Sequence, residues 1–419
     1  MPTPYKDVGE AVVTSFALRV FLPFAFGYFL SYLFRIVNVV IAPDLVADLQ
    51  LDAAQLGWIS SAYFLTFAIA QIPLGVLLDR YDVRHISCLL LFIAAAGATT
   101  FAMATAPWQL WLGRALIGLG VAACLMSAFR AYVHWLDAER LPLINGLQLA
   151  SGGMGALVAT APVEWLLQSW DWRQLFLLLT GMTLLAIVLV WLLVPAHRPQ
   201  ASGQSWRQQW QGSMQILTNP FFWRLAPASV VAQSLFVSLQ SLWAGQWLRD
   251  VTGYSREQAA DLLMLTAAAM VAGFIGLGWL AVRLQRLGVR TEQVSIAGMA
   301  IFVTTLILIV VEVALPAWLL WSLLGFFGTS GGLMYASLSQ AFPKHLAGRV
   351  NTNLNLLLFI AAFLTQWWMG LVLNLWQPDS AGHYPVEAFY LAFGLGITLL
   401  AVSLAWFVLS RAKPQSAHC

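Results

Sequence analysis

The amino-acid sequence predicts an all-α, polytopic membrane protein with 12 transmembrane helices, and two observations carry this prediction. Of the 419 residues, 60% are hydrophobic and only 9% are charged, whereas soluble domains carry about 25% charged residues. Apolar segments of about 20 residues, long enough to cross a hydrocarbon core of roughly 30 Å as a helix, recur along the chain. We place them at 15–43, 53–77, 85–106, 108–136, 141–166, 173–194, 222–248, 259–281, 293–314, 317–341, 351–375 and 386–410.

The first predicted helix is expected to remain in the membrane, because its apolar run is too long for a signal peptide and lacks an A-x-A cleavage site. Arg35 lies well inside this helix. A charge at the bilayer centre costs at least about 2.5–3.5 kcal/mol, so Arg35 is a functional candidate. Tyr32, Asn38 and Ser31 fall on the same face by i, i+3 and i+4 spacing. This face could bind a carboxylate, or Arg35 could bond neighbouring helix carbonyls in a structural role.

A charged turn follows the second predicted helix, in the segment GVLLDRYDVRH. Gly75 permits a close helix approach, and we expect Asp79, Arg80 and Arg84 to form a gate at the cytoplasmic mouth. The segment GWLAVRLQRLGVR occupies the equivalent place after the eighth helix, but there Val282 replaces the acidic residue. The two halves therefore carry related but asymmetric gating elements.

Charged residues in the fourth and fifth predicted helices are the next candidates. Arg114 lies in the fourth helix, and Arg130 lies near its cytoplasmic end, where we expect snorkelling or gate pairing with Asp137 or Glu139. Glu164 lies near the outer end of the fifth helix. Since no acidic residue lies near the middle of any predicted helix, Glu164 is the candidate for proton coupling.

The longest polar stretch divides the chain into two halves. We expect a six-helix bundle at 1–194, a cytoplasmic linker at 195–221, a second six-helix bundle at 222–410 and a cytoplasmic tail at 411–419. The seventh helix carries the polar stripe Gln240, Trp243 and Gln246, with Ser241 beside it. This stripe could complete a binding site from the second half or form a structural network between helices.

The distribution of basic residues predicts the orientation. Only Arg173, Arg249 and Arg256 fall in connections on one side, while the other basic residues outside the helices fall on the opposite side. The positive-inside rule makes the richer side cytoplasmic, with both termini inside, and we expect a bacterial inner membrane. The net charge of +3 then reflects topology, and no nucleic-acid partner is expected.

Several motifs together resemble the major facilitator superfamily. GVLLDRYDVRH is similar to that family's loop signature G-x-L-A-D-R-x-G-R, although Asp82 stands where the second glycine is usual. LGRALIGLG around Arg114 resembles its fourth helix, and NGLQLASGGMGALVATAP its glycine-rich fifth helix. DWRQLF and PKHLAGRVNTNLN resemble its connections before the sixth and eleventh helices.

The resemblance implies a secondary active transporter of a small organic solute, with two pseudo-symmetric six-helix bundles that work by alternating access. The pattern YLFR-x-x-N resembles the first helix of the organic-anion and phosphate-ester branches, in which an arginine at the position of Arg35 binds the anionic group. The family keeps a structural or proton-linked arginine at the position of Arg114. The seventh helix offers only Arg249 at its outer end, which favours a carboxylate over a phosphate ester. We expect proton symport through Glu164 or through a protonatable substrate, with coupling to another gradient as the alternative.

Two other function classes stay open at this point. An exporter of amphipathic or drug-like compounds is the main alternative, although such proteins usually bury an acid in the first half. A membrane enzyme or receptor lacks support, because the histidines His134, His345 and His383 are isolated and the cysteines show no metal-ligand spacing. We expect no cofactor, membrane lipids and a small solute as partners, and a monomer.

Overall fold

The computed structural model describes residues 16–136, 140–196, 206–343, 346–379 and 382–410, and none of these residues forms a strand. Their contacts divide the chain into two compact units. The first unit is Met1–Val37 with Ala62–Gly203, and the second is Asn38–Ser61 with Gln204–Cys419. The chain therefore enters the second unit briefly, near its start, and returns to the first before completing it.

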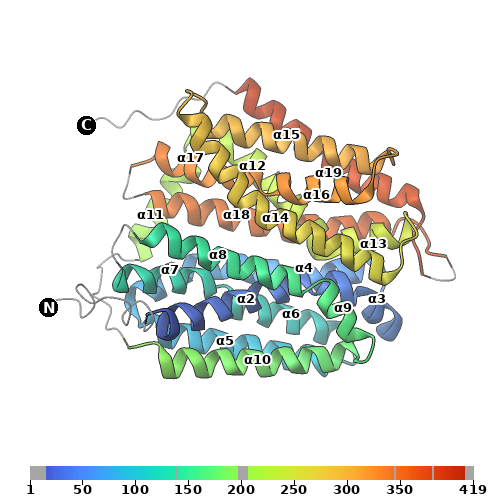
Figure 1. Cartoon of the computed structure of the whole chain (residues 1–419), viewed down its shortest axis with the longest axis horizontal. Helices are drawn as coiled ribbons and strands as arrows, with labels where there is room; N and C mark the ends of the chain where they lie inside the picture. Colours follow the sequence, from blue (N-terminus) through green and yellow to red (C-terminus); the bar gives the residue numbers. More distant parts are fainter. Residues whose placement is uncertain (1–15, 137–139, 197–205, 344–345, 380–381, 411–419) are drawn as a thin grey trace. The chain divides into compact units, whose positions relative to one another are not determined.

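Helices fill both units (Figure 1). The first unit contains η1 (Ala17–Phe21), α2 (Leu22–Ile36), α5 (Val83–Ala102), α6 (Pro107–Val121), α7 (Cys124–Trp135), α8 (Leu141–Val158), α9 (Ala161–Leu167) and α10 (Trp172–Leu193). The second contains α3 (Asn38–Leu49), α11 (Trp206–Leu217), α12 (Pro220–Ser238), η2 (Leu239–Trp243), α13 (Ala244–Asp250), α14 (Arg256–Gln285), α15 (Thr291–Val310), α16 (Ala317–Gly328), η3 (Ser330–Gly332), α17 (Leu333–Ala341), α18 (Ala347–Leu373) and α19 (Val386–Leu409). Helix α4 (Ala53–Arg80) begins in the second unit and continues in the first.

The membrane-spanning helices agree with the predicted fold class. Among the described residues, 11 helical stretches are long and apolar enough to cross a membrane. The predicted span at 141–166 folds as α8 and α9, which are separated at Ala159 and Thr160. Pro162 has no N–H to continue the hydrogen-bond ladder of α8, so the helix is interrupted there. When α8 and α9 are counted together as one further span, the structure is consistent with the 12 predicted spans. The all-α, multi-pass fold class is confirmed.

The two units repeat one packing pattern. In the first unit α2 packs on α8, and α5 packs on α6 and on α10. In the second unit α12 packs on α18, and α15 packs on α16 and on α19. When the predicted spans of each half are numbered from its start, both units pair the first span with the fifth, and the third span with the fourth and the sixth. Glycines at matching places permit the closest approach: Gly118 meets the backbone of Tyr63, and Gly325 meets that of Thr266.

Helix α3 and the start of α4 pack within the second unit. Helix α3 contacts η2 and α13, where Gly245 lies against Val39. At the start of α4, Gly57 lies against the carbonyl of Gln366 in α18. An ion pair joins α3 to α14, because Asp44 accepts hydrogen bonds from both terminal nitrogens of Arg256 at 2.7 and 2.8 Å. The second half of the first predicted span thus belongs to a different unit from its first half.

The predicted linker at 195–221 contains helix α11, which belongs to the second unit. Helix α11 packs on α18, where the guanidinium of Arg349 lies directly over Gly212. A Cβ atom at position 212 would overlap this guanidinium, so a larger residue there would displace the end of the Arg349 side chain.

Candidate functional site

A buried arginine and a set of aromatic rings form the candidate site of the first unit. Arg35 lies in the last turn of α2 and is only 8% exposed. Its guanidinium carbon lies 4.4 Å from the ring centre of Tyr32 and 5.4 Å from that of Phe67. Tyr32 in turn meets Tyr28 edge to face, with ring centres 5.2 Å apart. The structure therefore brings Arg35 and Tyr32 together, as the helical spacing predicted.

A second buried arginine shares a ring with the first. Arg114 in α6 is 1% exposed, and its guanidinium donates a hydrogen bond of 2.6 Å to the carbonyl of Phe34. The guanidinium carbon of Arg114 lies 5.0 Å from the ring centre of Tyr63, and that of Arg35 lies 5.9 Å from the same centre. The two carbons are therefore no further apart than the sum of these distances. The Tyr63 hydroxyl donates to the carbonyl of Ser31 at 3.1 Å, which fixes the shared ring.

Two guanidinium cations close together in a buried region attract an anion. Burial in a low-dielectric region raises the free energy of each cation unless opposite charge or hydrogen bonds compensate it. Arg114 forms no ion pair with any residue that the structure describes. A carboxylate bound between these groups would supply the missing negative charge, and a guanidinium can hold it through two parallel hydrogen bonds. The arrangement suits binding of an anion, with aromatic rings as its walls.

Asn38, predicted on the face of Arg35, lies in the second unit. Its side-chain amide donates to the hydroxyl of Ser60 at 2.9 Å, and the residue is fully buried. The boundary between the two units falls between Val37 and Asn38, although Val37 keeps helical backbone angles and donates to the carbonyl of Leu33 at 2.9 Å. Asn38 Oδ1 accepts no hydrogen bond from the described part of the chain.

The predicted polar stripe of the seventh span is divided by its local helix form. Residues Leu239–Trp243 form a π-helix, whose wider turn changes which side chains share a face. Gln240 donates from its amide to the sulfur of Met270 at 3.4 Å. Trp243 is fully buried, and its indole N–H donates to the carbonyl of Gln366 at 3.2 Å. Gln246 lies further along, in α13.

Gln366 is a polar residue of this region that the sequence analysis missed. It lies in α18, is fully buried and accepts a hydrogen bond of 2.9 Å from the hydroxyl of Ser241 through Oε1. Its amide nitrogen has no hydrogen-bond partner among the described residues. A single amide inside an apolar span is the signal that could have identified it, by the rule applied to the seventh helix.

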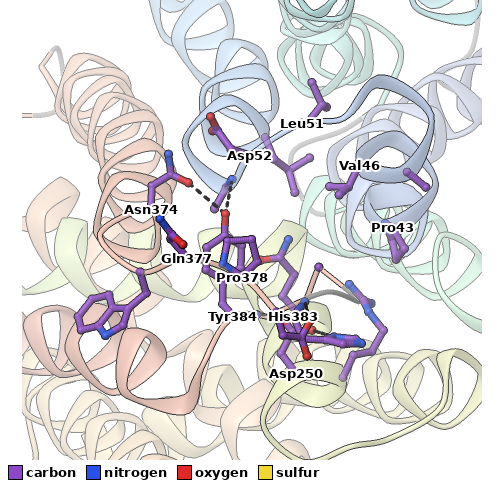
Figure 2. Close-up of a pocket in the computed structure, with 18 of the residues that line it drawn as sticks. Pro43, Val46, Leu51, Asp52, Asp250, Asn374, Gln377, Pro378, His383 and Tyr384 are labelled. Atoms are coloured by element: carbon purple, nitrogen blue, oxygen red, sulfur yellow. Dashed lines mark hydrogen bonds and ion pairs between the residues drawn. The ribbon is translucent and has the colours of Figure 1, made fainter.

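Gln246 lines a cavity of about 710 Å³ within the second unit. Its walls include Asp52 directly before α4, Asp250 at the end of α13, and residues 376–379 and 382–384 between α18 and α19 (Figure 2). In this connection His383 Nδ1 lies 2.8 Å from Asp250 Oδ1. The interpretation of His383 as an isolated residue is therefore wrong, because residues far apart in the sequence meet at this cavity.

The predicted gate residues lie at the end of α4 and the start of α5. Gly75 and Arg80 lie in α4, and Arg80 is exposed. Arg84 donates to the carbonyl of Val194 at 3.4 Å, and its guanidinium carbon lies 4.2 Å from the ring centre of Trp191. The side chain of Asp79 lies outside the described part of the chain.

The remaining candidates lie in α7 and α9. Arg130 is half-buried in α7, while Asp137 and Glu139, its predicted partners, lie outside the described residues. Glu164 lies in the first turn of α9 and is buried. No group of three or more metal-ligating side chains gathers within the described ranges.

Comparisons with known proteins give the family. The sequence profile of the Major Facilitator Superfamily matches residues 24–366. The probable galactarate/D-glucarate transporter GudP of Bacillus subtilis is 24% identical over 385 residues, which cover 82% of this chain and 83% of the relative. A galacturonate transporter of Dickeya chrysanthemi is 23% identical over 251 residues, 56% of this chain and 72% of the relative. The uncharacterized transporter YybO of Bacillus subtilis is 28% identical over 162 residues, and the matched region spans only 37% of its length.

The fold agrees with this family. The inward-facing, unoccupied crystal structure of a bacterial homologue of the human lysosomal transporter Spinster matches with a TM-score of 0.78. The match covers 96% of this chain and 97% of that protein at 16% identity, so it shows the shared fold alone. The profile match extends over most of the chain, from the start of the first span to Gln366. The chain therefore belongs to the Major Facilitator Superfamily and is a multi-pass membrane transporter.

Proposed function

We propose that the chain is a secondary active transporter of a small organic anion, and that the anion is a carboxylate of the sugar-acid type. The pair of buried guanidinium groups around Tyr63 carries this proposal. The names of two relatives support it, since one is called a galactarate/D-glucarate transporter and another a galacturonate transporter. Because the family consists of transporters, the membrane-enzyme alternative is excluded.

We assign different roles to the two arginines. Arg114 is held by the carbonyl of Phe34, so its main contribution is a fixed positive charge beside Tyr63. Arg35 lies over the half-buried Tyr32 ring and is the clamp for the carboxylate. Hydroxyl-rich substrates suit this surrounding, because the tyrosine hydroxyl of Tyr32 can donate to or accept from a sugar hydroxyl.

Ligand-dependent thermal unfolding of the purified full-length protein tests the proposal. A ligand that binds only the folded state raises the unfolding midpoint. Galactarate and galacturonate should raise it, and the neutral polyol galactitol should not. Arg35→Ala should weaken galactarate binding by roughly 10- to 150-fold, the equivalent of a lost hydrogen bond to a charged group. Arg19→Ala, which removes an exposed arginine of the same unit, should bind as the wild type does.

Two outcomes would count against the proposal. Undiminished galactarate binding in Arg35→Ala would remove Arg35 from the site. Stabilisation by cationic or neutral amphipaths, equal in the wild type and in Arg35→Ala, would favour the exporter of amphipathic compounds instead.

We also propose alternating access with proton symport, with Gly75, Asp79, Arg80, Arg84 and Arg130 as the gate on the cytoplasmic side. Uptake of galactarate into proteoliposomes should then increase when an inward proton gradient is imposed. Glu164→Gln should abolish this increase if Glu164 carries the proton, and should preserve it if the substrate carboxyl does. Asp79→Ala should slow uptake more than it weakens binding. A gradient without effect on uptake would contradict proton coupling.

The positive-inside pattern supports an inner-membrane location with cytoplasmic termini. Cys419 provides the test, since Cys88 and Cys124 are buried. A membrane-impermeant maleimide should label the protein only after the membrane has been permeabilised, and equal labelling of intact cells would reverse the orientation.

A further inference from the structure

We propose that the cavity around Gln246 in the second unit is a binding site for a small organic cation with a primary ammonium group. Its volume of about 710 Å³ lies within the range of small-molecule sites, roughly 300–1,000 Å³. Its walls are formed by the end of α3, the start of α4, the end of α13, and residues 376–379 and 382–384 between α18 and α19 (Figure 2).

Gln246 provides the first evidence for a ligand. Its side chain is 8% exposed and lines the cavity, and its Oε1 atom accepts no hydrogen bond from the described part of the chain. A buried acceptor without a donor raises the free energy of the folded state by about 1–3 kcal/mol. A donor on a bound ligand would remove this destabilisation, so the site is suited to a molecule that brings N–H or O–H groups.

The charges of the lining decide which donor fits. Asp52, Asp250 and Asp379 line the cavity, against the guanidinium of Arg249 and the ring of His383, so carboxylates outnumber basic groups even when His383 is protonated. Asp250 accepts from the ring of His383, and Asp379 accepts from its backbone N–H at 2.9 Å. Each carboxylate oxygen has two lone pairs, so these carboxylates can accept further hydrogen bonds. The excess of acceptors and of negative charge favours a positively charged donor.

Other ligand classes fit this lining less well. A carboxylate would meet three like charges, and a neutral polyol would leave the excess negative charge uncompensated. A metal ion needs several ligating side chains close together, and no group of three or more is found within the described residues. An ammonium group carries three hydrogen-bond donors and one positive charge. It can therefore donate to Gln246 Oε1 and also offset the negative charge of the carboxylates.

The site is independent of the proposed anion transport. All of its lining residues belong to the second unit, whereas Arg35, Arg114 and Tyr63 belong to the first. Loss of galactarate binding in Arg35→Ala therefore need not affect the cation, and each proposal can fail without the other.

Calorimetric titration of the purified full-length protein tests the inference. Putrescine, a diammonium probe, should bind, and 1,4-butanediol, its neutral analogue, should not. Gln246→Leu and Asp52→Asn should each weaken putrescine binding at least about tenfold. Asp261→Asn, which removes an exposed carboxylate of the same unit outside the cavity, should bind as the wild type does, and so should Arg35→Ala.

The variants also separate binding from folding. Asn at position 52 can still accept the 2.7 Å hydrogen bond from the backbone N–H of Gln55. Leucine at position 246 removes the acceptor that has no partner, so the ligand-free protein should unfold at the same temperature or higher while its affinity falls. No putrescine binding, equal binding of butanediol, or equal weakening by Asp261→Asn and Asp52→Asn would each overturn the inference.

Discussion

Gly118→Ala should destabilise the first unit and disturb the arginine cluster together. A Cβ atom at position 118 in α6 would lie 2.2 Å from the carbonyl oxygen of Tyr63 in α4, whereas ordinary van der Waals contact begins at 3.4 Å. The neighbour is backbone, so no side-chain rotation can relieve the overlap. One helix must move by about 1.2 Å, the difference between these distances. Overpacking of this kind costs roughly 1–3 kcal/mol.

The displacement would reach the site because the guanidinium carbons of Arg35 and Arg114 lie 5.9 and 5.0 Å from the centre of the Tyr63 ring. Gly118→Ala should therefore lower the thermal unfolding midpoint and also weaken galactarate binding. Gly181→Ala in α10 is the matched control, since nothing lies within 4 Å of the added atom. It should leave binding unchanged and the midpoint unchanged or slightly higher, because alanine favours helix over glycine. A wild-type midpoint and affinity in Gly118→Ala would refute the close contact of α4 and α6.

Two further predictions concern the second unit. A double-mutant cycle of Asp44→Ala and Arg256→Ala should give a coupling free energy of about 0.5–1 kcal/mol in thermal unfolding. The pair is bidentate, but its side chains are 30% and 37% exposed. A coupling of zero would mean that the pair contributes nothing to stability. Ser241→Ala should lower stability by about 1–2 kcal/mol, since it removes the donor to Gln366 Oε1 in a fully buried place. Ser322→Ala, whose hydroxyl bonds only its own helix, should change the unfolding midpoint little, and equal losses in both variants would contradict the role of Gln366.

Hydropathy could predict the spans, because a segment that crosses the membrane needs apolar side chains and a helix in which its backbone polar groups hydrogen-bond to one another. It could not predict that the first span is divided between two compact units after Val37, since the apolar pattern continues unbroken through this residue. This division separates two residues that are close in sequence: Arg35 belongs to the first unit, while Asn38 bonds Ser60 in the second. Identical helical spacing therefore correctly placed Tyr32 beside Arg35 but did not reveal the surroundings of Asn38.

The sequence could predict those site residues whose burial in an apolar span raises the free energy unless a partner compensates it. Arg35 and Arg114 stand out because a charge in an apolar span needs compensation. Tyr63 carries no charge, and its role depends on α4 meeting α2 and α6, a pairing of helices that one sequence does not contain. The same holds for His383 and Asp250, which are 133 positions apart and meet only in the fold.

Helix α4 gives a physical reason to examine the two proposed sites together. Asp52 immediately precedes this helix at the cavity of the second unit, and Tyr63 lies within the same helix at the arginine cluster of the first. A ligand can shift a conformational equilibrium only by its difference in affinity between the states, and coupling between two ligands is reciprocal. If putrescine changes the affinity for galactarate by some factor, galactarate must change the affinity for putrescine by the same factor. Unequal factors would mean that putrescine also acts outside the Gln246 cavity, whereas equal factors different from one would show that the two sites are coupled.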